Sequence, residues 1–310
     1  MAKQVGSTFH PCRFGESDYF MRQTTPAEVD YWLQNLHSLQ ETRECRAPEF
    51  FRPFHFVSLA LVLKANKAGR IELPEAVKRY ATRMHLWVAV GLRPPHQFNE
   101  QNSEGRFVPI ETLRSRDLVN DCSQRVMEIA AKANLSQEAK ESLDIAISEL
   151  MDNCFAHAGI EDGGLHGLAC AQYWPRGNLL QVAIADMGMG VRASLENADK
   201  EETRDRAKAE NCCNLATQLH TTSKSEKGHA GYGLALSRQL VANNGGTMGL
   251  YSGSEWLHVA GTNSQNGNQS VGWQGTLVLL EFDTTSVIST QKVYQAWPQV
   301  RGYSDDDFDF

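Results

Sequence analysis

A mainly apolar run that ends in an acidic turn with two glycines constrains the fold of this chain more than any other segment. Residues 179–185 predict a buried β-strand, and the chain continues directly as Asp186-Met187-Gly188-Met189-Gly190. A carboxylate at the end of a buried strand needs a polar partner, and the glycines let the backbone pass close to a ligand. Alone, the segment fits either an ordinary strand-end turn or a site where the carboxylate accepts from an amino group such as that of adenine.

A long helix is predicted from Ser136, its cap, to about residue 158. Glu149, Asn153 and Ala156 lie on one stripe of this helix because they are spaced four and three residues apart. An amide oxygen at Asn153 can hold Mg²⁺ beside a nucleotide, and a carboxylate one turn earlier can orient or deprotonate an attacking hydroxyl. A plain exposed polar face is the alternative. The opposite stripe is apolar and can pack on a sheet: Leu143, Ile147, Leu150 and Cys154.

A glycine-rich segment at 228–233 runs directly into a predicted helix at 234–243. Free N–H groups at a helix start, together with the helix dipole, favour phosphate. The polar residues 221–227 before it are predicted to form a lid, and contact of Lys224 with phosphate is a hypothesis. A last strand at about 273–283 begins with Gly275-Thr276, whose hydroxyl is a candidate for the adenine side of a site.

In this order, the four segments resemble the GHKL superfamily of ATP-binding domains (gyrase, heat-shock chaperone, histidine kinase, mismatch repair) over about residues 107–283. The resemblance implies an α+β fold whose C-terminal part is a Bergerat-type α/β sandwich, a mixed sheet with helices on one face. It also implies ATP and Mg²⁺ as cofactors. By resemblance, Asn153 would coordinate Mg²⁺ and Glu149 would be the general base. The other implied nucleotide-binding residues are Ala156, Asp186, Gly188, Met189, Gly190, Gly231, Tyr232, Gly233, Leu234 and Thr276.

The polar interval 94–106 is predicted to separate a small α/β domain, 1–100, from the ATP-binding domain, 107–290. Residues 291–310 form an extension with an acidic tail that should be disordered alone. The small domain is expected to contain a helix from Pro26, a strand at 54–64 and a helix at 74–90. That strand and helix resemble a STAS-like, anti-anti-sigma module with a regulatory or dimerising role. An extension used only for packing is the alternative.

Charge and composition disfavour several classes of binding partner. The formal net charge is −7 and no block of Lys and Arg occurs, so nucleic acid is disfavoured. No stretch approaches the roughly 18 apolar residues of a membrane span, and the N-terminus lacks a signal-peptide core. We therefore expect a cytoplasmic protein without a membrane partner. Seven cysteines without a Cys-x-x-Cys pair disfavour a zinc site or a disulfide scaffold.

Two residues indicate to which branch of the superfamily the chain is most similar. His37 lacks the acidic neighbour of a phosphorylatable histidine, which disfavours a complete histidine kinase, while Glu149 resembles the base of ATPases and anti-sigma serine kinases. A gyrase-like clamp is disfavoured because little chain follows residue 283. We expect a regulator that binds Mg-ATP, an ATPase or a Ser/Thr protein kinase of anti-sigma type, with a protein partner as phosphoacceptor or effector and with homodimers as an option. The alternative is a non-catalytic nucleotide-sensing module in a bacterial signalling or phage-defence complex.

Overall fold

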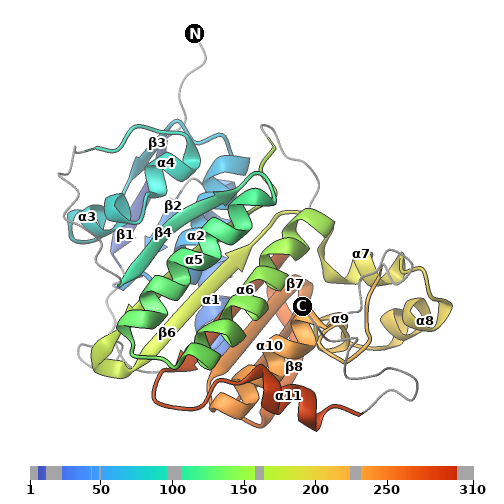
Figure 1. Ribbon diagram of the computed structural model, residues 1–310. Coiled ribbons are helices and arrows are strands. Elements are labelled where there is room, and N and C mark those ends of the chain that lie inside the picture. The colour runs from blue at the N-terminus through green and yellow to red at the C-terminus, as the bar shows by residue number, and fades with distance from the viewer. Residues whose placement is uncertain are drawn as a thin grey trace.

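A five-stranded sheet forms the centre of the molecule (Figure 1). The computed structural model describes residues 6–11, 23–42, 44–48, 50–95, 106–157, 164–223 and 232–298. The strand order is β4-β5-β6-β8-β7, and every pairing between neighbours is antiparallel. The strands are β4 (Phe107–Leu113), β5 (Gly167–Trp174), β6 (Leu179–Ala185), β7 (Thr247–Ala260) and β8 (Asn263–Asp283).

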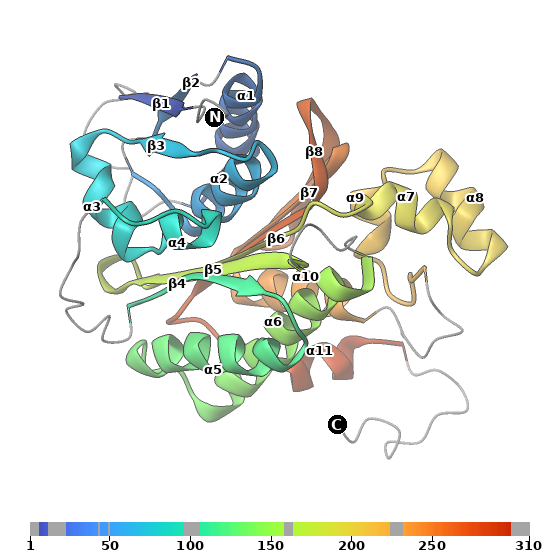
Figure 2. The same cartoon turned by 90° about the horizontal axis from the view of Figure 1, so that it is seen from above.

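Three helices cover one face of this sheet (Figure 2): α5 (Asp117–Lys132), α6 (Gln137–His157) and α10 (Gly233–Asn244). The predicted apolar stripe of α6 is buried, with Leu143 and Ile147 both 0 % exposed. Ser136 caps α6 as predicted, because its hydroxyl accepts a hydrogen bond from the amide of Ala139 at 3.1 Å. These helices and the sheet share one hydrophobic core.

The other face of the sheet is covered by α1 (Pro26–Thr42) and α2 (Pro53–Ala65), which pack on β8 and on β5, β6 and β8 respectively. The predicted strand at 54–64 is therefore wrong, because this run is the helix α2. Residues 53–63 are all buried, so the run is apolar on every side and has no periodicity to separate helix from strand. Pro53 at the first helical turn and the reciprocal contacts of Arg52 and His55 start the helix.

The rest of the N-terminal part adds a small parallel sheet in the order β2-β1-β3 and two short helices. The predicted helix at 74–90 is broken in two, because His85 has a φ of +60°. Many apolar residues of this part share a core with the second face of the large sheet. The elements are β1 (Gly6–Pro11), β2 (Glu44–Ala47), β3 (Arg70–Glu72), α3 (Glu75–Arg83) and α4 (Leu86–Val90).

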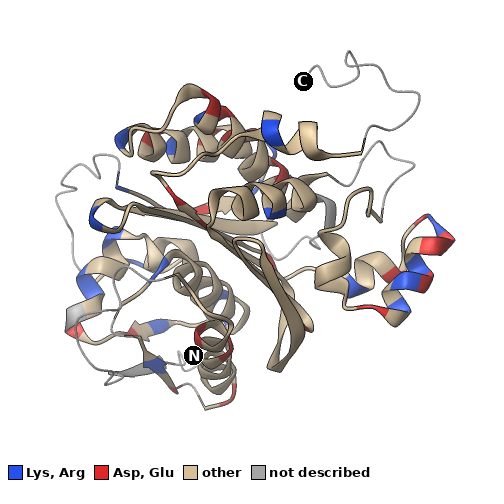
Figure 3. Cartoon of the chain, turned by 90° about the horizontal axis from the view of Figure 1, so that it is seen from below, with Lys and Arg blue, Asp and Glu red and all other residues tan. Residues whose placement is uncertain are grey.

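Strands β7 and β8 continue as a hairpin beyond the other strands, and α7 (Gly190–Glu196) and α9 (Cys212–Ala216) lie beside it (Figure 2). Helix α8 (Glu201–Ala209) packs on α7 and α9. Arg192 of α7 pairs with the buried Glu255 of β7, with Nη2 and Oε1 2.6 Å apart. The predicted helix at about 200–219 is thus two helices, α8 and α9. Figure 3 shows charges of both signs gathered on α8.

A buried polar cluster joins the N-terminal part to the sheet. Glu281 of β8 is 0 % exposed and accepts hydrogen bonds from the hydroxyl of Thr24 at 2.6 Å and the amide of Gln181 at 2.5 Å. Arg52 lies 3.4 Å from the same carboxylate and donates to Thr24 at 2.7 Å. Burial raises the pKa of Glu281, and the Arg52 charge and the hydrogen bonds oppose that rise. The buried Arg52–Glu281 pair and its hydrogen-bond partners therefore fix one arrangement of the N-terminal part against β8.

The predicted α/β sandwich is confirmed, with one correction. The strand pairings of the large sheet are all antiparallel rather than mixed. Helices α5, α6 and α10 cover one face as predicted, and α1 and α2 of the N-terminal part cover the other. A C-terminal helix, α11 (Thr290–Ala296), follows β8. The boundary interval 94–106 lies largely outside the described residues, so the domain limits stay a prediction.

Removing one member of the Arg52–Glu281 pair should destabilise the protein more than removing both. Arg52→Met or Glu281→Leu alone leaves an uncompensated buried charge, which costs about 3–5 kcal/mol. The double variant should lose less stability than either single variant, because neither charge remains. Urea unfolding of the four proteins measures the coupling. Additive losses would show that the two side chains do not interact in the folded state.

Candidate nucleotide-binding site

The turn after β6 holds Asp186, which is 5 % exposed. Its carboxylate accepts a hydrogen bond from the backbone amide of Gly188 at 2.7 Å. Its own amide donates to the carbonyl of Thr276 on β8 at 2.9 Å. The structure therefore brings together Asp186 and Thr276, which the sequence predicts for one side of a nucleotide site.

Gly275 allows this close approach. A Cβ at Gly275 would lie 2.3 Å from the carbonyl oxygen of Asp186 and 2.6 Å from the Cα of Met187, and its φ is +81°. Both the left-handed backbone and the lack of space require glycine here. Gly190 also has a positive φ, +78°, and a Cβ there would lie 3.2 Å from the Gly275 carbonyl oxygen. The predicted glycine turn is thus packed directly on β8.

Ser252 of β7 holds this packing together, although it is not among the residues that the sequence predicts for the site. Its hydroxyl accepts from the amide of Val191 at 2.8 Å and donates to the carbonyl of Gly275 at 2.6 Å. Ser252 is 2 % exposed. A serine within a predicted strand carries no recognisable signal for such a role, because only the fold places it under the turn.

Helix α6 reaches the same end of the sheet through Cys154. A Cβ at Gly167 would lie 2.7 Å from the Cys154 sulfur and 3.0 Å from the carbonyl oxygen of Ala185. Burial and then the negative charge of Asp186 raise the pKa of the Cys154 thiol. Asn153, the predicted Mg²⁺ ligand, is the preceding residue and is half-buried. The second half of α6 therefore lies over the turn that holds Asp186.

The start of α10 meets α6 at Glu149. A Cβ at Gly233, the first residue of α10, would lie 3.0 Å from both the Cβ and the Oε2 of Glu149. Glycine at this position lets the exposed carboxylate-bearing residue and the helix start approach each other. The structure thus joins Glu149 and Gly233, which are predicted for catalysis and for phosphate contact.

The remaining predicted residues are distributed around these contacts. Gly188 is half-buried, and Met189 is 58 % exposed at the start of α7. Tyr232 and Leu234 flank Gly233 and are half-buried. Thr276 has the strand parity of Val278 and Leu280, which belong to the core under the helices, so it lies on the same face as α6. Gly231, residues 224–230 of the predicted lid and the side chain of Ala156 lie outside what the structure describes.

The donor set fits a nucleotide with Mg²⁺. Mg²⁺ takes few protein ligands and keeps waters and phosphate oxygens, and the half-buried Asn153 offers one amide oxygen of the kind that this cation accepts. Gly190 and Gly275 let the turn pack closely on Ser252 and on the backbone of β8, which fixes the place of Asp186 at the end of β6. Tyr294 of α11 also lies near, since burial and then the charge of Glu149 raise the pKa of its phenol.

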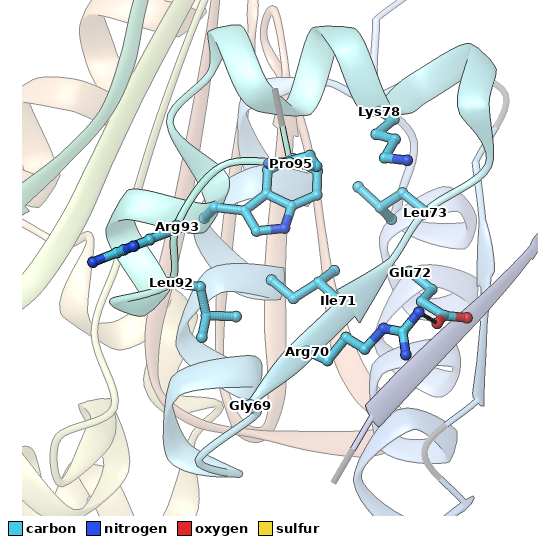
Figure 4. A pocket seen from close by; sticks show the side chains of 10 residues that line it. Gly69, Arg70, Ile71, Glu72, Leu73, Lys78, Leu92, Arg93 and Pro95 are labelled. Carbon is cyan, nitrogen blue, oxygen red and sulfur yellow. Dashed lines mark ion pairs between the residues drawn. The ribbon is translucent and has the colours of Figure 1, made fainter. Parts of the chain in front are cut away.

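A separate cavity of about 570 Å³ lies in the N-terminal part (Figure 4). Its lining includes Ile71, Leu73 and Leu92 together with Lys78, and it contains none of the predicted nucleotide-binding residues. Arg70 and Glu72 at its edge pair with each other, with Nη2 and Oε1 2.5 Å apart. The cavity is therefore distinct from the candidate nucleotide site.

Comparison with known proteins agrees with this geometry. Residues 114–243 match the family model of the histidine kinase-like ATPase domain. This segment runs from the start of α5 to the end of α10 and includes Glu149, Asn153, Asp186 and Gly233. The match supports a GHKL-type ATP-binding domain, similar to that of histidine kinases, over residues 114–243. A search of curated proteins found no match.

Within the described ranges, no helix is both long enough and apolar enough to cross a bilayer.

Replacing Gly275 by alanine should damage the fold more than the same change at Gly253. Gly253 also has a positive φ, +57°, but a Cβ there meets nothing within 4 Å. Gly253→Ala should therefore cost about 1–2 kcal/mol from the left-handed backbone alone. Gly275→Ala should cost about 1–3 kcal/mol more, because its Cβ overlaps the Asp186 backbone. Urea unfolding compares the two, and equal losses would contradict the tight packing of β8 on the turn.

Proposed function

We propose that this chain is an Mg-ATP-dependent regulator that hydrolyses ATP or transfers its terminal phosphoryl group to a Ser or Thr of a partner protein. The contact between Glu149 and Gly233 carries the proposal. It sets a carboxylate beside the first turn of α10, where backbone amides favour phosphate. Asn153 lies one turn further along the helix that carries Glu149, so the groups for base catalysis and for Mg²⁺ belong to one rigid element.

The base end of the nucleotide is assigned to the turn after β6. The Asp186 carboxylate would accept a hydrogen bond from the adenine amino group, with Thr276 supporting the same edge. Gly188, Met189 and Gly190 would border the base. The Gly188 amide and the packing of Gly275 support this role, because they orient the carboxylate before any ligand binds.

The phosphate end is assigned to the start of α10 and to α6. The backbone of residues 231–234 would contact the phosphates, with Ala156 on the nucleotide-facing stripe of α6. Mg²⁺ held through Asn153 supplies neutralisation of the phosphate charge. Glu149 would accept the proton of the attacking water or hydroxyl. The oxygen of that water or hydroxyl would bond to the terminal phosphorus while the bond from this phosphorus to the bridging oxygen breaks.

A second candidate is a nucleotide-sensing module in which ATP gates an interaction without being consumed. The buried cluster at Glu281 favours this candidate, because Glu281 lies on the strand that also carries Thr276. A shift of β8 on nucleotide binding would reach the N-terminal part, which shares a core with that strand. The N-terminal part would then act as a regulatory or dimerising surface for a protein partner.

Two substitutions separate binding from chemistry. Asp186→Asn removes a charged acceptor for adenine and should weaken ATP binding about ten- to a hundredfold. Glu149→Gln should leave ATP affinity nearly unchanged and lower turnover by about 10²–10⁴, the usual contribution of a general base. Calorimetry with Mg-ATP measures affinity. Incubation with labelled ATP, with and without the product of a neighbouring gene, measures free phosphate and partner labelling.

Glu141→Gln is the matched control, since Glu141 is an exposed glutamate two turns earlier on α6. It should leave both affinity and turnover unchanged. A wild-type chain that binds no adenine nucleotide would rule out both candidate functions. Tight ATP binding with neither free phosphate nor a labelled partner would reject the enzyme and leave the sensing module.

A further inference from the structure

Helix α11 is anchored to α6, although it lies outside the segment that matches the ATPase family. Ser289 caps α11 by accepting from the amide of Lys292 at 3.2 Å, and its hydroxyl also donates to Glu138 of α6. The amide of Thr290 donates to the hydroxyl of Ser142 at 2.8 Å. These bonds fix the start of α11 to the first turns of α6, and Figure 1 shows α11 beside α10 and α6.

The other end of α11 carries two aromatic rings that reach the start of α10. Trp297 stacks on Tyr232, with ring centroids 5.4 Å apart and an angle of 29° between the planes. Tyr294 packs edge-on against Trp297 at 5.2 Å. Tyr232 also meets His220 at 5.4 Å. Tyr232 is therefore held on two sides by aromatic rings from other segments.

Tyr232 lies directly before the helix start that is assigned to the phosphates. It immediately precedes Gly233, the residue that touches Glu149. Fixing the Tyr232 ring therefore fixes the backbone that leads into the first amides of α10. These amides keep their direction toward a phosphate only if the backbone before them is held.

We propose that Trp297 is a positioning residue of the nucleotide site, which acts by holding Tyr232 and thereby the phosphate-facing start of α10. Tyr294 packs edge-on against the Trp297 ring. The hydrogen bonds between α11 and α6 hold the helix that carries these two rings. This proposal rests on the proposed function of the site. It assigns to a helix beyond the matched segment a part in binding the phosphates.

A purely structural role for α11 makes a different prediction. Val293 of α11 is 0 % exposed and belongs to the core under the helices. If α11 only closed that core, substitutions at Trp297 would lower stability without a specific effect on ATP. Positioning instead requires that affinity for ATP follow the presence of an aromatic ring at 297.

The test measures Mg-ATP and Mg-ADP affinity by calorimetry in the full chain, alongside the unfolding midpoint. Trp297→Ala should weaken ATP binding about three- to tenfold, the effect of one lost aromatic pair. Trp297→Phe keeps a ring for Tyr232 and should restore affinity to within about twofold of the wild type. Gln295→Ala, at an exposed position of the same helix, is the matched control and should bind as the wild type does.

The outcomes separate the two proposals. If the wild type binds no ATP, the proposed function fails. If the wild type binds ATP and Trp297→Ala binds it equally well, only the role of Trp297 is overturned. The same holds if Trp297→Phe binds as weakly as Trp297→Ala, because a ring at 297 then does not decide affinity. If the alanine variant unfolds at the assay temperature, Trp297→Phe and Tyr232→Leu are compared instead. Tyr232→Leu should lose about three- to tenfold in ATP affinity, as expected for Trp297→Ala, while Trp297→Phe should stay within about twofold of the wild type.

Discussion

Burial of both faces of the five-stranded sheet is the constraint on which the rest of the structure depends. Helices α5, α6 and α10 cover one face, and α1 and α2 cover the other. A charged residue in such a sheet must find its partners inside the protein. Glu281 finds them in Thr24, Gln181 and Arg52. The N-terminal part is therefore attached to the sheet by a geometrically specific polar contact as well as by apolar area.

Strand β8 connects this contact to the candidate nucleotide site. Side chains alternate along a strand, so Thr276 lies on the helix-covered face while Glu281 lies on the face toward the N-terminal part. Gly275 presses the same strand against the backbone of Asp186. One strand thus contacts the turn assigned to adenine at Gly275 and the N-terminal part at Glu281, and its antiparallel bonds to β6 over residues 277–283 limit independent movement of the two contacts.

The sequence predicts the ATP-binding half of the fold well because its elements have clear signals. Helix α6 has a cap, a polar stripe and an apolar stripe, and the turn after β6 has glycines that the backbone requires. The prediction fails for α2, since a helix buried on all sides has no amphipathic period. It fails for the break at His85 because a positive φ at a non-glycine residue is decided by tertiary packing.

Within the site, Asp186 with Thr276 and Glu149 with Gly233 meet as the motif order suggests. Ser252 and Trp297 do not emerge from the sequence, because their partners are distant residues that only the fold brings to them.

The N-terminal part and α11 both lie outside the matched region, and they pack on opposite sides of the sheet. The N-terminal part packs on one face near Glu281, whereas α11 packs on the helices of the other face near Tyr232. The candidate site lies on the helix-covered face between β6, β8, α6 and α10, so it contacts α11 through Tyr232 and the N-terminal part through β8. On the proposed function, a change in the adenine end moves a strand that the N-terminal part holds, while a change in the phosphate end moves a helix start that α11 holds. Because ATP and ADP share the adenine end and differ only in the terminal phosphate, the phosphate end and the helix start held by α11 would distinguish the two nucleotides.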